Sequence, residues 1–202
     1  MSRLPAQQRR SQLLDHAAAV FARVGYARAT TAELARAAGV TEPIIYRHFD
    51  SKRDLFIALI ERSAERTIAT WERHLAGAKD PAERLLKLLG DNPMVAPAGR
   101  DDYRVLLQAI TEVDDEGIRA AVRRHMDNLH GFIAREIKLA QDEHKVTGRF
   151  SADVISWLLI HIGMGYGVVA AMGYGDHGAD ALGVHPQDVV ARILVGKAAE
   201  RA

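Results

Sequence analysis

Apolar residues recur through most of the chain at intervals of three and four, which is the spacing of one face of an α-helix. Near the N-terminus, Leu14, Ala17, Ala18 and Phe21 keep this spacing and predict a helix with one apolar stripe. Gly25 follows, where the end of a helix favours a residue that accepts a positive φ. No segment alternates apolar and polar residues with the period of two typical of a half-buried strand. The pattern predicts an all-α protein.

Two short helices are predicted next. Thr30 and Glu33 have the spacing of a capping box and open the first helix, which ends at Gly39. Thr41 is placed to cap the second, a helix of about nine residues and roughly 13 Å. Pro43 falls in the first turn of that helix, where the N–H that proline lacks is not needed.

Longer helices occupy the rest of the chain. One begins at Asp50 or Ser51 and runs to Leu75, just ahead of Gly77. Proline and glycine clusters separate the elements beyond it. These elements are helices at about 81–90, 101–113, 117–144, 151–174 and 186–200, with a loop at 91–99.

The two short helices and the turn between them have the features of a helix-turn-helix. The segment runs from Thr30 to Arg53 and reads TTAELARAAGVTEPIIYRHFDSKR. Ala35 and Ala38 are small enough to let the two helices cross closely, and Gly39 accepts the positive φ of the turn. In such motifs the second helix lies in the DNA major groove, which is roughly 12 Å wide. The segment therefore predicts DNA binding.

The same segment resembles the DNA-binding signature of the TetR family of transcription regulators. That signature reads T-T-x-x-[LI]-A-x-x-A-G-V-[ST]-x-x-x-[LI]-Y-x-[HY]-F-x-[ST/N]-K-x-x-L-[FL]. The fixed spacing of Y-x-H-F-x-x-K makes the match specific. The chain matches at Thr30, Thr31, Leu34, Ala35, Ala38, Gly39, Val40, Thr41, Ile45, Tyr46, His48, Phe49, Ser51, Lys52, Leu55 and Phe56. By motif the resemblance covers about the first quarter of the chain, and beyond it only length and helical layout agree.

The resemblance implies which side chains anchor the DNA backbone. Tyr46, His48 and Lys52 match positions whose polar tips contact phosphates. Thr31 and Thr41, near backbone N–H groups at helix starts, are further candidate phosphate anchors. Such contacts fix the register of the protein on DNA without reading its sequence.

Base reading is assigned to the exposed positions of the second short helix. An arginine can bind guanine through two hydrogen bonds, a glutamate can accept one from cytosine, and an isoleucine can pack on a thymine methyl. The candidates are Glu42, Pro43, Ile44 and Arg47. For Arg53 two interpretations stay open, a contact with phosphate and a solvated surface charge.

The charge distribution supports a division of the chain into an N-terminal three-helix DNA-binding domain at 1–53 and a helical effector-binding and dimerisation domain at 54–202. Residues 1–53 carry nine lysines and arginines against four acidic residues, a net charge of +5. The remainder carries 18 against 22, so a basic segment precedes an acidic one. That asymmetry is expected where only the N-terminal part meets phosphate. Arg9 and Arg10 are interpreted as a solvated tail.

The resemblance also implies a homodimer, held by the last two helices of each copy. Gly163, Gly167 and Ala171 recur every four residues and form a smooth ridge at which a second helix can approach closely. Flanking apolar residues extend the predicted interface. They are Trp157, Ile160, Met164, Val168 and Met172. Two copies read a palindrome, with half-sites about one helical turn apart.

The segment from 154 to 175 is long and apolar enough to suit a membrane span of roughly 20 residues. Its glycines and the absence of basic flanks favour a helix packed at a protein interface instead. The N-terminal residues show no apolar run before a cleavage site, and the chain has no cysteine. We therefore expect a cytoplasmic protein without disulfides.

Aromatic and methionine side chains at helical spacing suggest a pocket for a small apolar or amphipathic effector, although each of them individually fits plain core. The candidates are Trp71, Tyr103, Leu107, Met126, Leu129, Phe132, Trp157 and His161. A metal site and a cofactor are not expected, because His125 and His130 lie five apart on different helix faces. Two alternatives remain open, a helical enzyme and an interaction module that no longer binds DNA.

Overall fold

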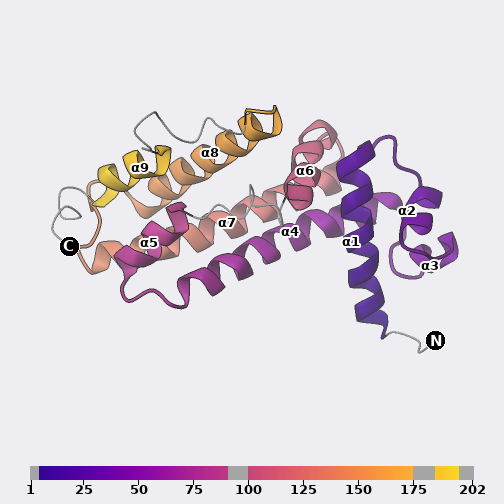
Figure 1. Cartoon of the computed structure of the whole chain (residues 1–202), viewed down its shortest axis with the longest axis horizontal. Coiled ribbons are helices and arrows are strands. Elements are labelled where there is room, and N and C mark those ends of the chain that lie inside the picture. The colour runs from indigo at the N-terminus through magenta and orange to yellow at the C-terminus, as the bar shows by residue number, and fades with distance from the viewer. Residues whose placement is uncertain (1–4, 91–99, 175–184, 196–202) are drawn as a thin grey trace. The chain divides into compact units, whose positions relative to one another are not determined.

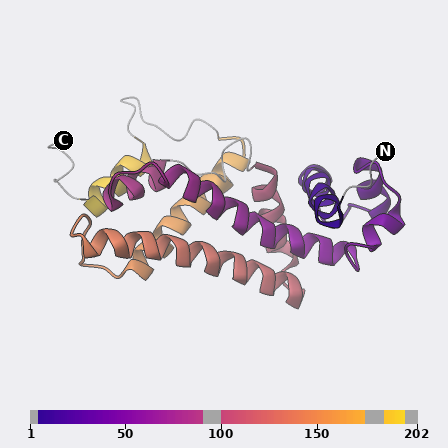
Figure 2. The ribbon, with the colours of Figure 1, turned by 90° about the horizontal axis from the view of Figure 1, so that it is seen from below.

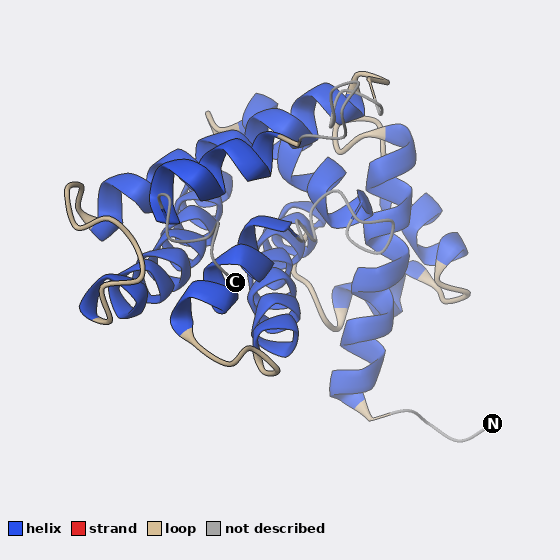
Figure 3. Ribbon diagram, turned by 60° about the vertical axis from the view of Figure 1, so that its left-hand side comes forward, coloured by secondary structure: helices blue, strands red, loops and turns tan. Residues whose placement is uncertain are grey.

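A computed structural model describes residues 5–90, 100–174 and 185–195, and every regular element in these ranges is a helix (Figure 3). The prediction of an all-α fold is confirmed. The α-helices are labelled in Figure 1. The elements are α1 (Ala6–Val24), α2 (Thr31–Ala37), α3 (Glu42–Tyr46), α4 (Lys52–Leu75), α5 (Pro81–Gly90), α6 (Arg100–Ala109), the 3₁₀ turn η1 (Ile110–Glu112), α7 (Glu116–Asp142), α8 (Ala152–Ala171) and α9 (Pro186–Val195).

The predicted helix boundaries hold for most elements. The helix predicted to run to Leu75 and the one at 81–90 end where the sequence placed them. The last predicted helix is described only as far as Val195, and the predicted loop at 91–99 lies outside the described residues.

The chain divides into two compact units. The described residues of unit 1 fall within Met1–Glu65 and Pro97–His125, and those of unit 2 within Arg66–Ala96 and Met126–Ala202. The divisions fall inside the long helices α4 and α7, so the units do not coincide with the predicted segments 1–53 and 54–202. The reason is that α6 packs against α1 and therefore belongs with the N-terminal helices.

Unit 1 is built around an aromatic cluster and the side-chain amide of Gln108. Phe21 and Phe56 are fully buried, with ring centroids 5.3 Å apart, and Tyr26 stacks on Phe56 at 4.3 Å. Gln108 of α6 donates from Nε2 to the carbonyl oxygen of Phe21 at 2.7 Å, and its Oε1 accepts the backbone N–H of Tyr26 at 2.9 Å. A side chain from α6 thus gives the carbonyl oxygen of Phe21, which also accepts the N–H of Gly25, a second donor, and it bonds the backbone N–H of Tyr26 just beyond α1.

Unit 2 has its own apolar core, to which α4, α5, α7, α8 and α9 contribute. Trp71 stacks on Phe132 with ring centroids 5.5 Å apart. Helices α5 and α9 lie side by side in this unit (Figure 2). A buried ion pair joins α5 to α7, where Arg84 donates to the two carboxylate oxygens of Glu136 at 2.7 and 3.0 Å. Glu136 is only 3% exposed, so its charge needs compensation, which Arg84 provides through two hydrogen bonds and Arg135 from 3.9 Å.

Candidate DNA-binding site

The turn between α2 and α3 has the geometry that the sequence predicts. Thr30 Oγ1 accepts the backbone N–H of Glu33 at 3.2 Å, and Glu33 Oε2 accepts that of Thr30 at 2.9 Å. The backbone N–H and the hydroxyl of Thr30 both donate to Glu33 Oε2, and these two hydrogen bonds lower the pKa of Glu33. Gly39 has a φ of +63°, in the region that favours glycine. The capping box and the glycine turn are therefore confirmed.

Helix α3 is shorter than the predicted nine residues. It spans Glu42–Tyr46, and the prediction of its length is wrong. The carbonyl oxygen of Ile45 accepts the N–H groups of both His48 and Phe49, which tightens the chain into a turn. Ile45 and Phe49 are both buried, so the backbone turns inward where a longer helix would continue outward. Thr41 occupies the N-cap position, but its side chain makes no capping hydrogen bond.

The predicted base-reading residues share the solvent side of α3. Glu42, Pro43 and Arg47 are exposed and Ile44 is half-buried, whereas Ile45 faces the core. Arg47 is the C-cap residue, so its side chain stands at the end of the helix. These positions offer a positive, a negative and an apolar group to a facing surface.

Two predicted phosphate anchors meet beside α3. Tyr46 is 50% exposed, and its hydroxyl donates to Thr31 Oγ1 at 3.3 Å. One residue comes from α3 and the other from the first turn of α2, so the pair brings two hydroxyl groups to one place. His48 is partly exposed in the turn that follows α3. Contact of these residues with DNA stays a prediction.

Lys52 has an internal role that sequence reasoning missed. Its Nζ donates to the carbonyl oxygens of Tyr26 at 2.9 Å and of Ala29 at 3.0 Å, and it lies 4.5 Å from the centre of the Tyr26 ring. The ammonium thus holds the loop between α1 and α2 against the start of α4. A phosphate that binds Lys52 would therefore share its ammonium with the carbonyl oxygens of Tyr26 and Ala29.

A second cation near α3 was also missed. The guanidinium of Arg10, in α1, lies 4.9 Å from the centre of the Phe49 ring. The sequence predicts a solvated tail at Arg10, and no pattern in it relates this residue to a ring 39 positions further on. It adds positive charge beside the turn that ends α3.

The candidate effector residues do not form one group. In unit 2, Trp71, Leu129 and Phe132 share the buried core, and Met126 packs against it. Tyr103 and Leu107 belong to unit 1, where burial raises the pKa of Tyr103. The remaining two, Trp157 and His161, stand on the exposed side of α8. There the ring of Trp157 stacks on His130 at 4.7 Å.

The apolar exposed side of α8 differs from the predicted glycine ridge. Of the predicted interface residues, Ile160 and Gly167 are buried and Met164 packs on the core, whereas Trp157, Ala171 and Met172 are exposed and Gly163 and Val168 lie between these extremes. Four exposed apolar residues at helical spacing define what we term the α8 face. They are Val154, Trp157, Leu158 and Ile162. Val189 and Ile193, four apart on α9, are exposed as well.

Helix α8 also contains an 18-residue stretch, Ala152–Val169, that is long and apolar enough to cross a membrane by length and composition. Of this stretch, 22% is buried within the protein. Among the described residues it is the one such stretch, and this is weak evidence for a membrane span because core helices of water-soluble proteins meet the same criterion.

Comparisons with known proteins place the helix-turn-helix in a family. Residues 13–59 match the family model described as bacterial regulatory proteins, tetR family. The transcriptional activator FasR of Mycolicibacterium smegmatis is 38% identical over 84 residues, which are 42% of this chain and 38% of that protein. The nucleoid occlusion factor SlmA of Marinobacter nauticus is 40% identical over 112 residues, 55% of this chain and 57% of that protein. The matches thus span about half, or less, of these relatives' own length.

A solved structure agrees over almost the whole chain. It is that of a protein from Saccharomonospora viridis described as a transcriptional regulator, in complex with choline, with a TM-score of 0.73 and 24% identity over 92% of this chain and 93% of that one. At this identity the likeness shows the fold. The helical fold and the turn geometry define a helix-turn-helix protein. Residues 13–59 match the tetR family of bacterial regulatory proteins, and the solved structure shares the fold of this chain.

Proposed function

We propose that the chain is a cytoplasmic DNA-binding transcription regulator, which binds a palindromic operator as a homodimer and responds to a small molecule, most simply as a repressor. The observation that carries this proposal is the outward side of α3. Glu42, Pro43 and Arg47 are exposed there, while Ile45 anchors the helix in the core. Polar, hydrogen-bonding groups held on a short rigid helix are what base reading in the major groove requires.

The α8 face supports the homodimer. It presents apolar side chains at helical spacing, with Val154 at 60% exposure. A contiguous exposed apolar surface on a protein of this size is typical of an interface with another protein. A second copy of the chain is the simplest partner, because one α3 reads too few base pairs for useful specificity and a twofold pair reads a palindrome.

Trp71 supports an effector site in the core of unit 2. Its side chain is 7% exposed, and its Nε1 finds no hydrogen-bond partner among the described residues. A buried donor without a partner costs stability, about 1–3 kcal/mol, and such groups are rare in folded proteins. A small molecule with an acceptor atom on a largely apolar body would satisfy it, while the stacked ring of Phe132 would contact its apolar part.

Two other functions make different predictions. A helical enzyme would turn over a molecule bound in unit 2, whereas the proposed regulator would return it unchanged. An interaction module on the same fold would bind DNA weakly at every salt concentration. The proposed regulator binds its operator tightly and loses affinity steeply with added salt, because each phosphate contact contributes a slope of about −0.9 in log K against log salt.

Selection of bound fragments from the source genome, followed by mobility shifts on the recovered sites, tests the proposal. Palindromic sites upstream of genes would support it, and sites scattered without relation to genes would contradict transcriptional regulation while leaving DNA binding intact. Arg47→Ala should change which sites are preferred, losing about 1–3 kcal/mol of discrimination at the base it reads. Tyr46→Phe should weaken binding to all sites by a similar factor. Arg73→Ala removes the same charge from unit 2 and serves as the control.

A further inference from the structure

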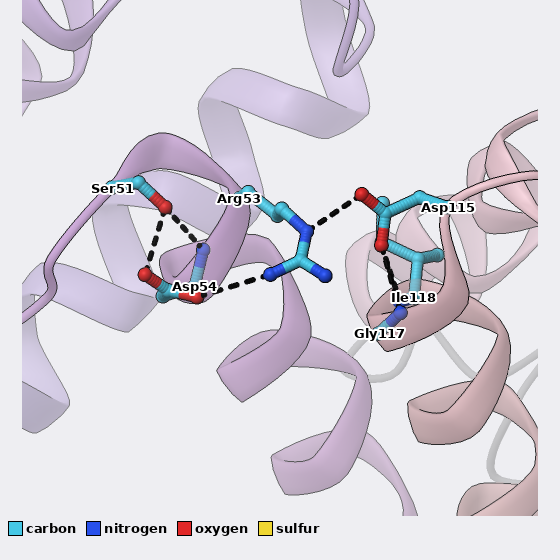
Figure 4. A network of polar contacts seen from close by, with 6 residues as sticks. All are labelled: Ser51, Arg53, Asp54, Asp115, Gly117 and Ile118. Atoms are coloured by element: carbon cyan, nitrogen blue, oxygen red, sulfur yellow. Dashed lines mark hydrogen bonds and ion pairs between the residues drawn. The ribbon is translucent and has the colours of Figure 1, made fainter.

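An ion pair joins the first turn of α4 to the residue that directly precedes α7, within unit 1 (Figure 4). Arg53 Nε donates to Asp115 Oδ2 at 2.6 Å. The other carboxylate oxygen of Asp115 accepts the backbone N–H groups of Gly117 at 2.9 Å and Ile118 at 3.0 Å. Asp115 therefore caps α7 and binds α4 at the same time. The hydrogen bond from Arg53 is the largest cause that lowers the pKa of Asp115, to about 2.

Gly117 makes room for this contact. A Cβ at this position would overlap Arg53 Nη2 and would lie 2.9 Å from Arg53 Cζ and 3.1 Å from Ile57 Cδ1. The guanidinium thus lies directly against the start of α7, where a side chain would displace it. In the same helix, a Cβ at Gly131 would meet no atom within 4 Å.

The α4 end of the pair is tied to the turn that follows α3. Arg53 Nη1 lies 3.6 Å from Asp54 Oδ1, and Ser51 Oγ donates to Asp54 Oδ2 at 2.8 Å. Ser51 Oγ also accepts the backbone N–H of Asp54 at 3.1 Å. Phe49, two residues earlier, is buried. The path from the ion pair to the base of α3 therefore runs through the side chains of Asp54 and Ser51 and then along the backbone to Phe49.

We propose that Arg53, Asp115 and Gly117 form a clamp that positions α3 for DNA binding by holding the start of α4 against the start of α7. This rests on the proposed function. Arg53 is then a positioning residue, because its guanidinium donates to Asp115 and lies beside Asp54.

The clamp and a direct phosphate contact predict opposite effects for one substitution. If Arg53 contacted phosphate, Asp115→Asn would remove a competing negative charge and strengthen DNA binding. If Arg53 positions α3, Asp115→Asn weakens binding about tenfold, as does Arg53→Gln, and the double variant is no weaker than either single one. The salt dependence stays unchanged, whereas loss of a phosphate contact would reduce its slope by about 1.

Matched variants complete the experiment, a mobility-shift series on an operator fragment. Asp114→Asn makes the same charge change at an exposed neighbour and should not weaken binding. Gly117→Ala should weaken binding like Arg53→Gln because the added Cβ displaces the guanidinium, while Gly131→Ala should not. The clamp is overturned if Asp115→Asn binds DNA as tightly as Asp114→Asn does. It is also overturned if the losses in affinity from Asp115→Asn and Arg53→Gln add up in the double variant.

A second readout needs no DNA and so separates the clamp from the proposed function. Amide hydrogen exchange of Asp54 and Leu55, whose N–H groups bond to Ser51, reports on the first turn of α4 in the free protein. Asp115→Asn should accelerate exchange of both amides severalfold, and Asp114→Asn should leave it unchanged. If the wild type binds no DNA but this acceleration is seen, the proposed function fails, while the hold of the clamp on the start of α4 is still supported. Unchanged exchange in Asp115→Asn would rule out the clamp.

Discussion

The two units differ in what they expose and in what they bury. Unit 1 presents polar side chains from α3, and its ion pair between Arg53 and Asp115 stays open to solvent. Unit 2 presents apolar side chains from α8 and buries its ion pair between Arg84 and Glu136. The two ion pairs therefore have different tasks. A solvent-reachable pair adds little stability and can set a position, whereas a buried pair is needed for the fold once it is there.

The largest effect is expected from breaking the buried pair of unit 2. Arg84→Met removes both hydrogen bonds that a guanidinium donates to the buried carboxylate of Glu136, leaves only the more distant Arg135 at 3.9 Å, and should destabilise the protein by about 3–5 kcal/mol. Urea unfolding at pH 7 measures this. Replacing both charged residues by apolar ones, with Arg84→Met and Glu136→Leu together, should recover most of the lost free energy of unfolding. A single variant as stable as the wild type would show that Glu136 does not depend on Arg84.

The next effect concerns the exposed apolar side of unit 2. Leu158→Glu with Ile162→Glu puts two like charges on the α8 face and should give a folded monomer, seen by analytical ultracentrifugation. Affinity for a palindromic operator should fall about 100-fold, because two linked copies of α3 bind together where one binds alone. Leu139→Glu, at an exposed apolar position of α7, is the control. A dimer that survives the double change would place the interface elsewhere.

Local patterns predicted most of the fold and part of the site. The stripe of α1, the capping box at Thr30 and the turn at Gly39 depend on residues within a few positions of one another, so the sequence carries them. The length of α3 depends on the burial of Phe49, which is a tertiary effect. The ammonium of Lys52 binds carbonyl oxygens 23 and 26 residues earlier, and Arg53 binds Asp115, 62 residues later. No local pattern contains such pairings.

Helix α8 shows a different limit. It is apolar on nearly all sides, so the periodicity that reveals the buried face of α1 is weak in α8. The spacing of the glycines predicts a dimer interface that includes Ile160, Gly163 and Gly167. In the structure, however, Ile160 and Gly167 are buried. Which side of such a helix is exposed follows from the packing of its neighbours. The exposed set of Leu158 and Ile162 became visible only with the structure.

The smallest effect would sharpen the contrast between the two ion pairs, and it depends on pH. The pKa of Asp115 is lowered to about 2 in the folded protein, against about 3.9 for an unfolded aspartate. A carboxyl whose folded pKa is depressed contributes stability that is fully present above the unfolded value and is lost as the pH falls through the folded value. The difference in Tm between wild type and Asp115→Asn should therefore be constant above pH 5 or so and shrink between about pH 4 and pH 2.

Comparing the two proteins at each pH removes the titration of all other carboxyl groups, which both share. In a protein that carries Arg53→Gln, the Tm difference caused by Asp115→Asn should be smaller. The reason is that the hydrogen bond from Arg53 is the largest cause of the lowered pKa of Asp115. Asp114→Asn, next to Asp115 and exposed, supplies the baseline for loss of one charge. A Tm difference that stays constant down to pH 2 would mean that the charge of Asp115 does not hold α4 to α7, and the distinction between a positioning pair and a structural pair would lose its basis.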